Sequence, residues 1–318
     1  MNSPTNAAPV ADGEIAVVFE QVSKWFGPVV AVSDVSFTIG SGVTSILGPN
    51  GAGKSTVMRL LCGLTKPSTG MVRVYGQDPR VNPGIYRELG LVPQQETVIE
   101  PITCLQFVTL AAQLSDVANP KHAAIEAVRK VELDPDDKRP IGSYSKGMRQ
   151  RAKVAAAIVH GPRLLVLDEP LNGLDPRQRA RMIELFTELG MNGRSVIVTS
   201  HVLEEIERFG SRIILIAEGR LAAEGEYTQI RALMDDRPLR VRIESDDPRL
   251  LASELMRSDS LTAVSLAGDS LIADVVNAPV FRRLIARACQ DHNLDLREVV
   301  PLDDDLESVF RYLVSRRH

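Results

Sequence analysis

A glycine-rich loop that ends in a lysine and a serine carries the clearest chemical signal of the 318-residue sequence. Residues 48–56 satisfy the pattern G-x-x-x-x-G-K-[ST], with a strand-like run before them and a helix-like run after them. The glycines let backbone N–H groups point inward around phosphates, Lys54 adds a full charge, and the Ser55 hydroxyl suits Mg²⁺. The loop therefore predicts nucleotide binding. Its candidate phosphate-binding residues are Gly48, Pro49, Asn50, Gly51, Ala52, Gly53, Lys54, Ser55 and Thr56.

Two carboxylates at the end of an apolar run supply the second half of a hydrolytic site. The run Leu-Leu-Val-Leu at 164–167 is followed by Asp168, which can hold Mg²⁺ directly or through water. The next residue, Glu169, can accept a proton from a water molecule that attacks the terminal phosphate. On its own, such a run is also typical of a buried strand that ends in solvated acids. Beside the glycine-rich loop it favours nucleotide hydrolysis, without indicating what the hydrolysis drives.

The elements that must position these residues alternate between short β-branched runs and helical patterns over the first 232 residues. This alternation predicts an α/β fold with a largely parallel sheet. Between residues 100 and 160 the pattern is helical only, so we expect an inserted helical subdomain at about 95–160. The expected strands are 15–20, 43–47, 89–92, 164–167, 196–199 and 212–216, and the expected helices are 54–63, 176–189 and 202–209.

A polar run with a proline at 234–238 separates two regions of different composition and is interpreted as a linker. Residues 1–13 are interpreted as a flexible leader, 14–233 as the catalytic domain and 239–318 as a small α+β accessory domain. The accessory domain reads as strand, helix, strand, strand, helix, strand, with a last helix at 306–314. The first six elements match the split-βαβ, ferredoxin-like order.

Composition narrows the classes of function. The chain has 37 basic and 41 acidic residues, a formal charge of −4, which argues against a dedicated nucleic-acid binder. The three cysteines, Cys62, Cys104 and Cys289, lie far apart in the sequence, so we expect neither a disulfide framework nor a zinc site, and a reducing, cytosolic compartment. No segment approaches the ~18 consecutive apolar residues of a membrane span. Any membrane role is expected to come through a partner.

Three further motifs distinguish among nucleotide-binding families: Tyr-Ser-Lys-Gly-Met-Arg-Gln-Arg at 144–151, Gly-Leu-Asp at 173–175, and His201 after the next strand. With these residues the sequence resembles the nucleotide-binding subunit of ATP-binding cassette (ABC) transporters over roughly residues 14–232. The resemblance implies a P-loop NTPase cassette with an inserted helical subdomain, and ATP and Mg²⁺ as cofactors.

The resemblance also implies roles for individual residues on the nucleotide side of the site. Phe26 matches the aromatic residue that stacks on adenine, although the neighbouring Trp25 can take that role. Gln94 matches the glutamine that reaches Mg²⁺ and the attacking water and that couples the helical subdomain to the membrane partner, with Gln95 as the ambiguity. His201 matches the histidine near the γ-phosphate.

The remaining family positions imply that each ATP site is completed by a second subunit. Ser145 and Gly147 match the residues that grip the γ-phosphate bound to the opposite subunit, and Asp175 matches the loop that links the two sites. The motif departs from the commoner Leu-Ser-Gly-Gly-Gln form at Tyr144, Lys146 and Met148, and Met148 cannot supply the glutamine's polar contact. The Tyr-Ser-Lys-Gly-Met form and the last helix resemble the ABC-2 type export subfamily.

The expected function is therefore an ATPase subunit that powers export through separate transmembrane permease subunits, as a homodimer or beside a related ATPase, and without nucleic acid. Its expected location is cytoplasmic, peripheral on the inner face of the membrane. The family's docking groove is expected beside Gln94, with Val98 and Ile99 as apolar contacts. Two alternatives are a soluble ABC ATPase acting on ribosomes or DNA and a non-catalytic nucleotide switch. The accessory domain can be a cover, a dimer contact or a ligand sensor.

Overall fold

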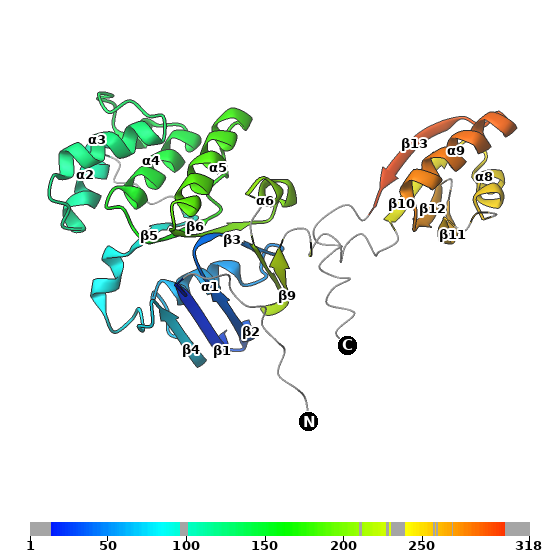
Figure 1. The fold of residues 1–318 in the computed structure, drawn as a ribbon. Helices are drawn as coiled ribbons and strands as arrows, with labels where there is room; N and C mark the ends of the chain where they lie inside the picture. Colours follow the sequence, from blue (N-terminus) through cyan, green and yellow to red (C-terminus); the bar gives the residue numbers. More distant parts are fainter. Residues whose placement is uncertain are drawn as a thin grey trace. The chain divides into compact units, whose positions relative to one another are not determined.

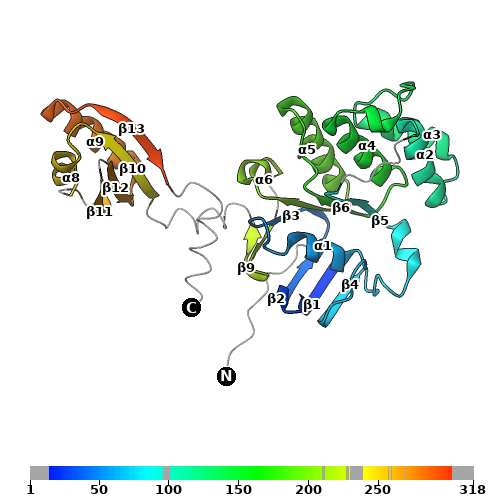
Figure 2. The same cartoon turned by 180° about the vertical axis from the view of Figure 1, so that it is seen from behind.

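The computed structural model describes residues 14–95, 101–209, 212–226, 229 and 239–302, apart from 257, 259 and 269. The chain divides into two compact units, Met1–Tyr227 and Thr228–His318 (Figures 1 and 2). The expected leader at 1–13, the linker at 234–238, the helix at 306–314 and the apolar contacts Val98 and Ile99 lie outside the described residues.

A six-stranded sheet forms the centre of the first unit. All of its neighbouring strands are parallel except the last pair, so the expectation of a largely parallel sheet is confirmed. The two strands that precede Glu169 and His201 are buried along their whole length, as is usual for strands covered on both faces. The strands are, in sheet order, β5 (Leu89–Val92), β6 (Leu164–Asp168), β7 (Ser195–Ser200), β3 (Gly42–Leu47), β8 (Arg212–Ala217) and β9 (Arg220–Glu226).

The strand expected at residues 15–20 is observed as the first strand of the chain, and it belongs to a separate antiparallel sheet. Here β1 (Val17–Phe26) lies between β2 (Val29–Ile39) and β4 (Thr69–Val74). The physical reason is the tight turn after Phe26, which folds β2 directly back onto β1, with Phe26 opposite Val29. The Phe19 and Phe37 rings stack at 4.5 Å in the core that this sheet shares with α1 (Lys54–Leu61).

Helices α2 (Cys104–Leu114), α3 (Pro120–Lys130) and α4 (Lys146–Ile158) form the inserted subdomain, and they confirm the helical reading of that segment. Thr103 and Gln106 form a capping box that starts α2. Two more helices, α5 (Pro176–Met191) and α6 (Leu203–Phe209), pack on β3 and β7. None of the helices in the described ranges is long and apolar enough to cross a membrane.

In its described residues, the second unit has a four-stranded antiparallel sheet and two helices. Its strand order is β11-β12-β10-β13, and its six elements lie where the sequence predicted them. Leu251, Leu255, Phe281 and Ile285 from the helices share one buried core with residues of the strands, among them Ile243. The elements are β10 (Leu239–Ser245), α8 (Pro248–Leu255), β11 (Leu261–Ala267), β12 (Ser270–Val275), α9 (Ala278–His292) and β13 (Leu296–Pro301).

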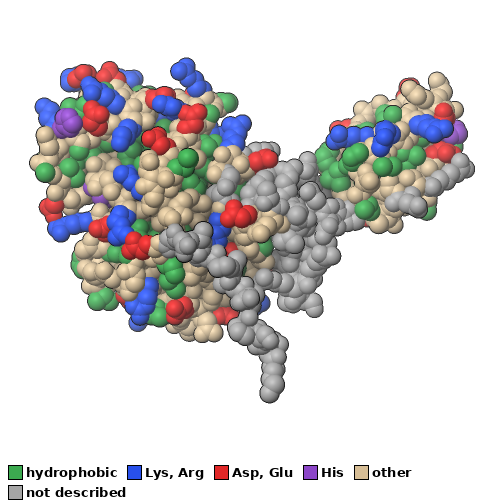
Figure 3. Space-filling model, viewed as in Figure 1, with side chains coloured by type: hydrophobic (Ala, Val, Ile, Leu, Met, Phe, Trp, Pro, Cys, Tyr) green, Lys and Arg blue, Asp and Glu red, His purple; other side chains and the backbone are tan. Residues whose placement is uncertain are grey.

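Charged side chains of both signs are mixed over the visible face of each unit (Figure 3). This distribution agrees with the near balance of 37 basic and 41 acidic residues in the sequence. The charge pattern therefore offers no single-sign surface on that face of the described residues.

The three cysteines are expected to differ in reactivity, because their burial differs. Burial raises the pKa of Cys62 and of Cys104 to about 12, whereas Cys289 is partly exposed. Since the thiolate is the reactive form, iodoacetamide at pH 8 should label Cys289 first and leave the other two until the protein unfolds. Mass spectrometry of the labelled protein measures this order. Fast labelling of Cys62 in the folded protein would contradict the packing of α1.

Candidate functional site

The glycine-rich loop connects the end of β3 to the start of α1 and has a backbone that only glycine permits. Gly53, the residue before the helix, has φ of 103°. A Cβ atom at Gly53 would lie 2.4 Å from the Ala31 carbonyl oxygen, and one at Gly48 would lie 2.3 Å from the Ile216 oxygen. Among the described residues, no side chain caps α1, so its first N–H groups face the loop without a capping partner. This is the arrangement that binds anions at a helix N-terminus.

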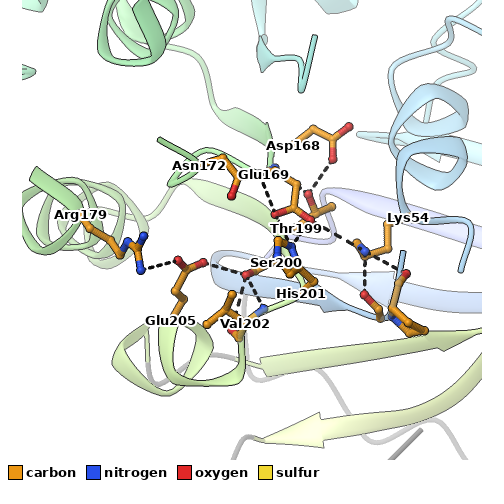
Figure 4. Close-up of polar contacts among 12 residues, drawn as sticks. Lys54, Asp168, Glu169, Asn172, Arg179, Thr199, Ser200, His201, Val202 and Glu205 are labelled. Atoms are coloured by element: carbon orange, nitrogen blue, oxygen red, sulfur yellow. Dashed lines mark hydrogen bonds and ion pairs between the residues drawn. The ribbon is translucent and has the colours of Figure 1, made fainter. Parts of the chain in front are cut away.

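Lys54 is buried at the base of this loop. Its ammonium donates to the carbonyl oxygens of Gly48, at 2.6 Å, and Pro49, at 3.1 Å, and lies 3.9 Å from a carboxylate oxygen of Glu169 (Figure 4). Burial lowers the pKa of Lys54, and the charges of Glu169 and Asp168 oppose that effect only in part. The loop and the acid strand therefore meet at a desolvated cation.

The Thr199 hydroxyl joins the two acidic residues. It donates to the Asp168 carboxylate at 2.7 Å and accepts the backbone N–H of Glu169 at 2.8 Å (Figure 4). Asp168 and Thr199 are direct partners in the pairing of β6 and β7, so the parallel register places them side by side. The hydroxyl therefore fixes the turn in which Glu169 takes a φ of 53°, in the left-handed region.

Glu169 and His201 contact each other, and His201 forms the exposed side of this network. The Nδ1 atom of His201 lies 2.9 and 3.0 Å from the two carboxylate oxygens of Glu169, and the Asn172 amide donates to the same carboxylate at 3.4 Å. Glu169 is buried, whereas the His201 side chain is 41% exposed. A carboxylate held in this way can accept a proton from a water molecule at the open side of the site.

A second group of contacts fixes the turn that carries His201. The Ser200 hydroxyl donates to the Glu205 carboxylate at 2.8 Å and accepts the Val202 N–H at 3.0 Å, and Arg179 lies 3.3 Å from Glu205. Sequence reasoning missed Thr199, Ser200 and Glu205. The available signal was a pair of hydroxyl residues at the end of an otherwise apolar strand.

The structure brings together some of the predicted site residues but not others. Contacts join the loop residues Gly48, Pro49 and Lys54 with Asp168, Glu169 and His201. Phe26 is 48% exposed under the Lys24 ammonium, and Gln94 is exposed. Among the contacts given for the described residues, neither belongs to the network around Glu169.

The residues expected to act on the opposite subunit lie at two helix starts. Ser145 is the N-cap of α4, and its hydroxyl accepts the Met148 N–H at 3.2 Å. Asp175 is the N-cap of α5 and accepts the Gln178 N–H at 2.8 Å. Both caps are exposed, whereas Gly147 is buried behind them. Their side chains are available to a partner surface, and their helix starts offer positive dipole ends.

Comparison with known proteins agrees with this geometry. The protein-family model described as ABC transporter matches residues 32–172. The chain is 32% identical to the daunorubicin/doxorubicin resistance ATP-binding protein of Streptomyces peucetius, covering 90% of this chain and 88% of that protein. It is 33% identical to the Nod factor export ATP-binding protein I of Paraburkholderia xenovorans, covering 95% of this chain and 98% of that protein.

Solved structures match the first unit. An ATP-binding subunit of an ABC transporter superposes with a TM-score of 0.64 at 26% identity, covering 69% of this chain and 93% of that one. A dimeric ATP-binding cassette in a post-hydrolysis state, bound to ADP and phosphate, has a TM-score of 0.62 at 27% identity and covers 66% of this chain and 98% of that one. Similarity in both sequence and fold therefore points to the same family.

Thr199→Val tests the hydroxyl that joins Asp168 to Glu169. Valine keeps the shape of the side chain but leaves the Glu169 N–H and the Asp168 carboxylate without their partner, so kcat for ATP hydrolysis should fall by about tenfold. The matched control is Thr187→Val, because the buried Thr187 hydroxyl has no protein partner among the described residues. Steady-state ATPase rates compare the two variants. If the two variants hydrolyse ATP at equal rates, the Thr199 hydroxyl has no role in hydrolysis.

Proposed function

The chain belongs to the ATP-binding subunits of ABC transporters, and from that membership we propose that it powers export through separate membrane-spanning permease subunits. It is an ATPase whose hydrolysis is coupled to transport. Two relatives, named for drug resistance and for Nod factor export, align with 90% and 95% of this chain, beyond the cassette itself. That long match supports the assignment to ABC-2 type export.

The observation that carries the catalytic part of the proposal is the network around Glu169. One carboxylate is held by His201, lies 3.9 Å from Lys54 and follows Asp168 at the end of a buried strand. A phosphate-binding loop, a general base and a second acid thus meet at one edge of the sheet. A nucleotide switch without hydrolysis would not require a carboxylate held at this place.

We assign the roles within one subunit as follows. Lys54 and the N–H groups of residues 48–56 bind the phosphates, with Phe26 or the adjacent Trp25 against adenine. Glu169 accepts the proton of the attacking water, and His201 holds its carboxylate. Ser55, Asp168 and Gln94 would hold Mg²⁺, because side-chain oxygens beside phosphates and water are the ligands that this ion prefers. When bound, Mg²⁺ neutralises charge on the phosphate oxygens.

We infer that the second half of each site comes from another subunit, either a second copy or a related ATPase. The exposed caps Ser145 and Asp175, with Gly147, would contact ATP bound to the partner. The dimeric cassette among the structural matches supports this arrangement. The permease would dock beside Gln94 and hold the ATPase on the inner face of the membrane.

The second unit is proposed to have a ferredoxin-like topology. Support comes from its element order and from the strand order β11-β12-β10-β13 with antiparallel neighbours throughout. We propose that it covers the cassette or contributes to the dimer, in preference to a role as a ligand sensor.

Glu169→Gln tests the general base. The amide cannot accept the proton, so hydrolysis should slow by roughly 10²-fold or more while ATP binding is retained. Lys54→Ala is the contrasting variant, which should lose ATP affinity because a charge-assisted phosphate contact is removed. Fluorescent-nucleotide binding and phosphate release separate the two effects. Near-normal turnover of Glu169→Gln would assign the base elsewhere.

ATP-dependent dimerisation tests the completion of each site by a partner. Ligand that binds the closed dimer better than the monomer must favour dimerisation. Glu169→Gln, which retains ATP, should sediment as a dimer with Mg-ATP and as a monomer or loose dimer without it. The double variant with Lys54→Ala should not respond. Sedimentation that is the same with and without ATP, in a chain that is monomeric throughout, would contradict the arrangement.

A further inference from the structure

Lys153, on helix α4, is a buried cation to which the proposed mechanism gives no role. Lys153 is only 5% exposed. The ammonium donates to the backbone carbonyl oxygens of Pro93, at 2.9 Å, and Gln95, at 3.2 Å. Both acceptors lie about 60 residues earlier in the chain, after β5 of the catalytic sheet. Lys153 therefore ties the helical insert to the segment that leaves that sheet.

The two carbonyl groups stand on either side of Gln94. A lysine that holds both neighbours of one residue restricts the backbone from which that residue's side chain projects. Gln94 itself is exposed, so its side chain stays available to the site while its backbone is tethered. Movement of α4 must therefore move the backbone of Gln94 or break two charge-assisted hydrogen bonds.

The same helix carries Ser145 at its N-cap. Ser145 and Lys153 are eight positions apart, which is about 12 Å along a helix axis at 1.5 Å per residue. α4 is a continuous helix over Lys146–Ile158, so the two ends of this stretch move together. One end is the proposed contact with the ATP of the partner, and the other end holds the backbone of Gln94.

A second buried cation on α4, Arg151, differs from Lys153 in the part of the chain that it binds. Arg151 is also buried, and it donates to the carbonyl oxygens of Val131, at 3.1 Å, and Glu132, at 2.7 Å. Those acceptors belong to the insert itself, at the end of α3. Arg151 therefore holds α4 within the insert, whereas Lys153 holds α4 to the catalytic core.

We propose that Lys153 is a positioning residue that links Ser145 to Gln94 within one subunit. When Ser145 contacts the nucleotide bound to the partner subunit, Lys153 changes the position of Gln94 in the subunit's own ATP site. Lys153 thereby couples hydrolysis at the two ATP sites. This inference rests on the proposed dimer, in which Ser145 and Gln94 of one chain serve different sites. The lysine acts through Gln94 and does not itself touch nucleotide.

Lys153→Met in the full chain tests the coupling, with Arg151→Met as the matched control. Loss of the tether should lower kcat by about tenfold, leave KM for ATP within about twofold and reduce the Hill coefficient towards one. In a Gln94→Ala background the same substitution should cause no further loss of kcat, because its effect passes through Gln94. Arg151→Met should lower the melting temperature without changing the Hill coefficient.

Several results would overturn the inference. The first is a Lys153→Met enzyme that keeps the wild-type Hill coefficient. The second is a full additional loss of kcat when Lys153→Met is added to Gln94→Ala. The third is an Arg151→Met enzyme that loses as much cooperativity as Lys153→Met. If Lys153→Met does not fold, Lys153→Gln is measured in the same way, since its amide keeps polar atoms in the interior. A wild-type chain that hydrolyses ATP without cooperativity or ATP-dependent dimerisation would instead contradict the proposed dimer.

Discussion

Strands β3, β6 and β7 run parallel and end at one level, and the chemistry of the first unit depends on this alignment. Leu47, the last residue before the phosphate loop, pairs with Ser200, while Asp168 pairs with Thr199. Because the carboxyl ends of parallel strands lie at one edge, the loop, both acids and His201 emerge together. A shift of one residue in the β6–β7 pairing would move Thr199 away from the Asp168 carboxylate and the Glu169 N–H.

The site contains buried charged side chains, and burying each of them without polar partners would be costly in free energy. Lys54 and Glu169 are both nearly inaccessible to water, and each would be strongly destabilising without polar partners. The loop carbonyls and His201 provide those partners. The left-handed backbone of Glu169 adds local strain of about 1–3 kcal/mol, which the Thr199 hydrogen bond helps to offset. The backbone strain at Glu169 therefore lowers local stability at the position where its carboxylate must lie to accept a proton.

A buried side chain of the helical insert is hydrogen-bonded to the backbone of the segment that follows β5. Lys153 donates to the carbonyl groups on either side of Gln94, whereas Arg151 donates to carbonyl groups within the insert. A subdomain attached in this way can rotate as a body while its own packing stays intact. A movement of the insert can thus be passed to the backbone around Gln94 through the hydrogen bonds that Lys153 donates.

The sequence by itself determined the phosphate loop, the two acids, the helical insert and the order of elements in the second unit, because each is written in local spacing and periodicity. The family motifs also marked Ser145, Asp175 and His201. Only the tertiary structure decided that residues 17–26 belong to a separate antiparallel sheet, since strand partners are determined by long-range packing and by the turn after Phe26. It also placed Thr199 and Lys153 beside their hydrogen-bond partners. The threonine lies in an apolar strand and the lysine in an Ala-rich helix, and their hydrogen-bond partners lie about 30 and 60 residues away. No local sequence pattern predicts contacts over such separations.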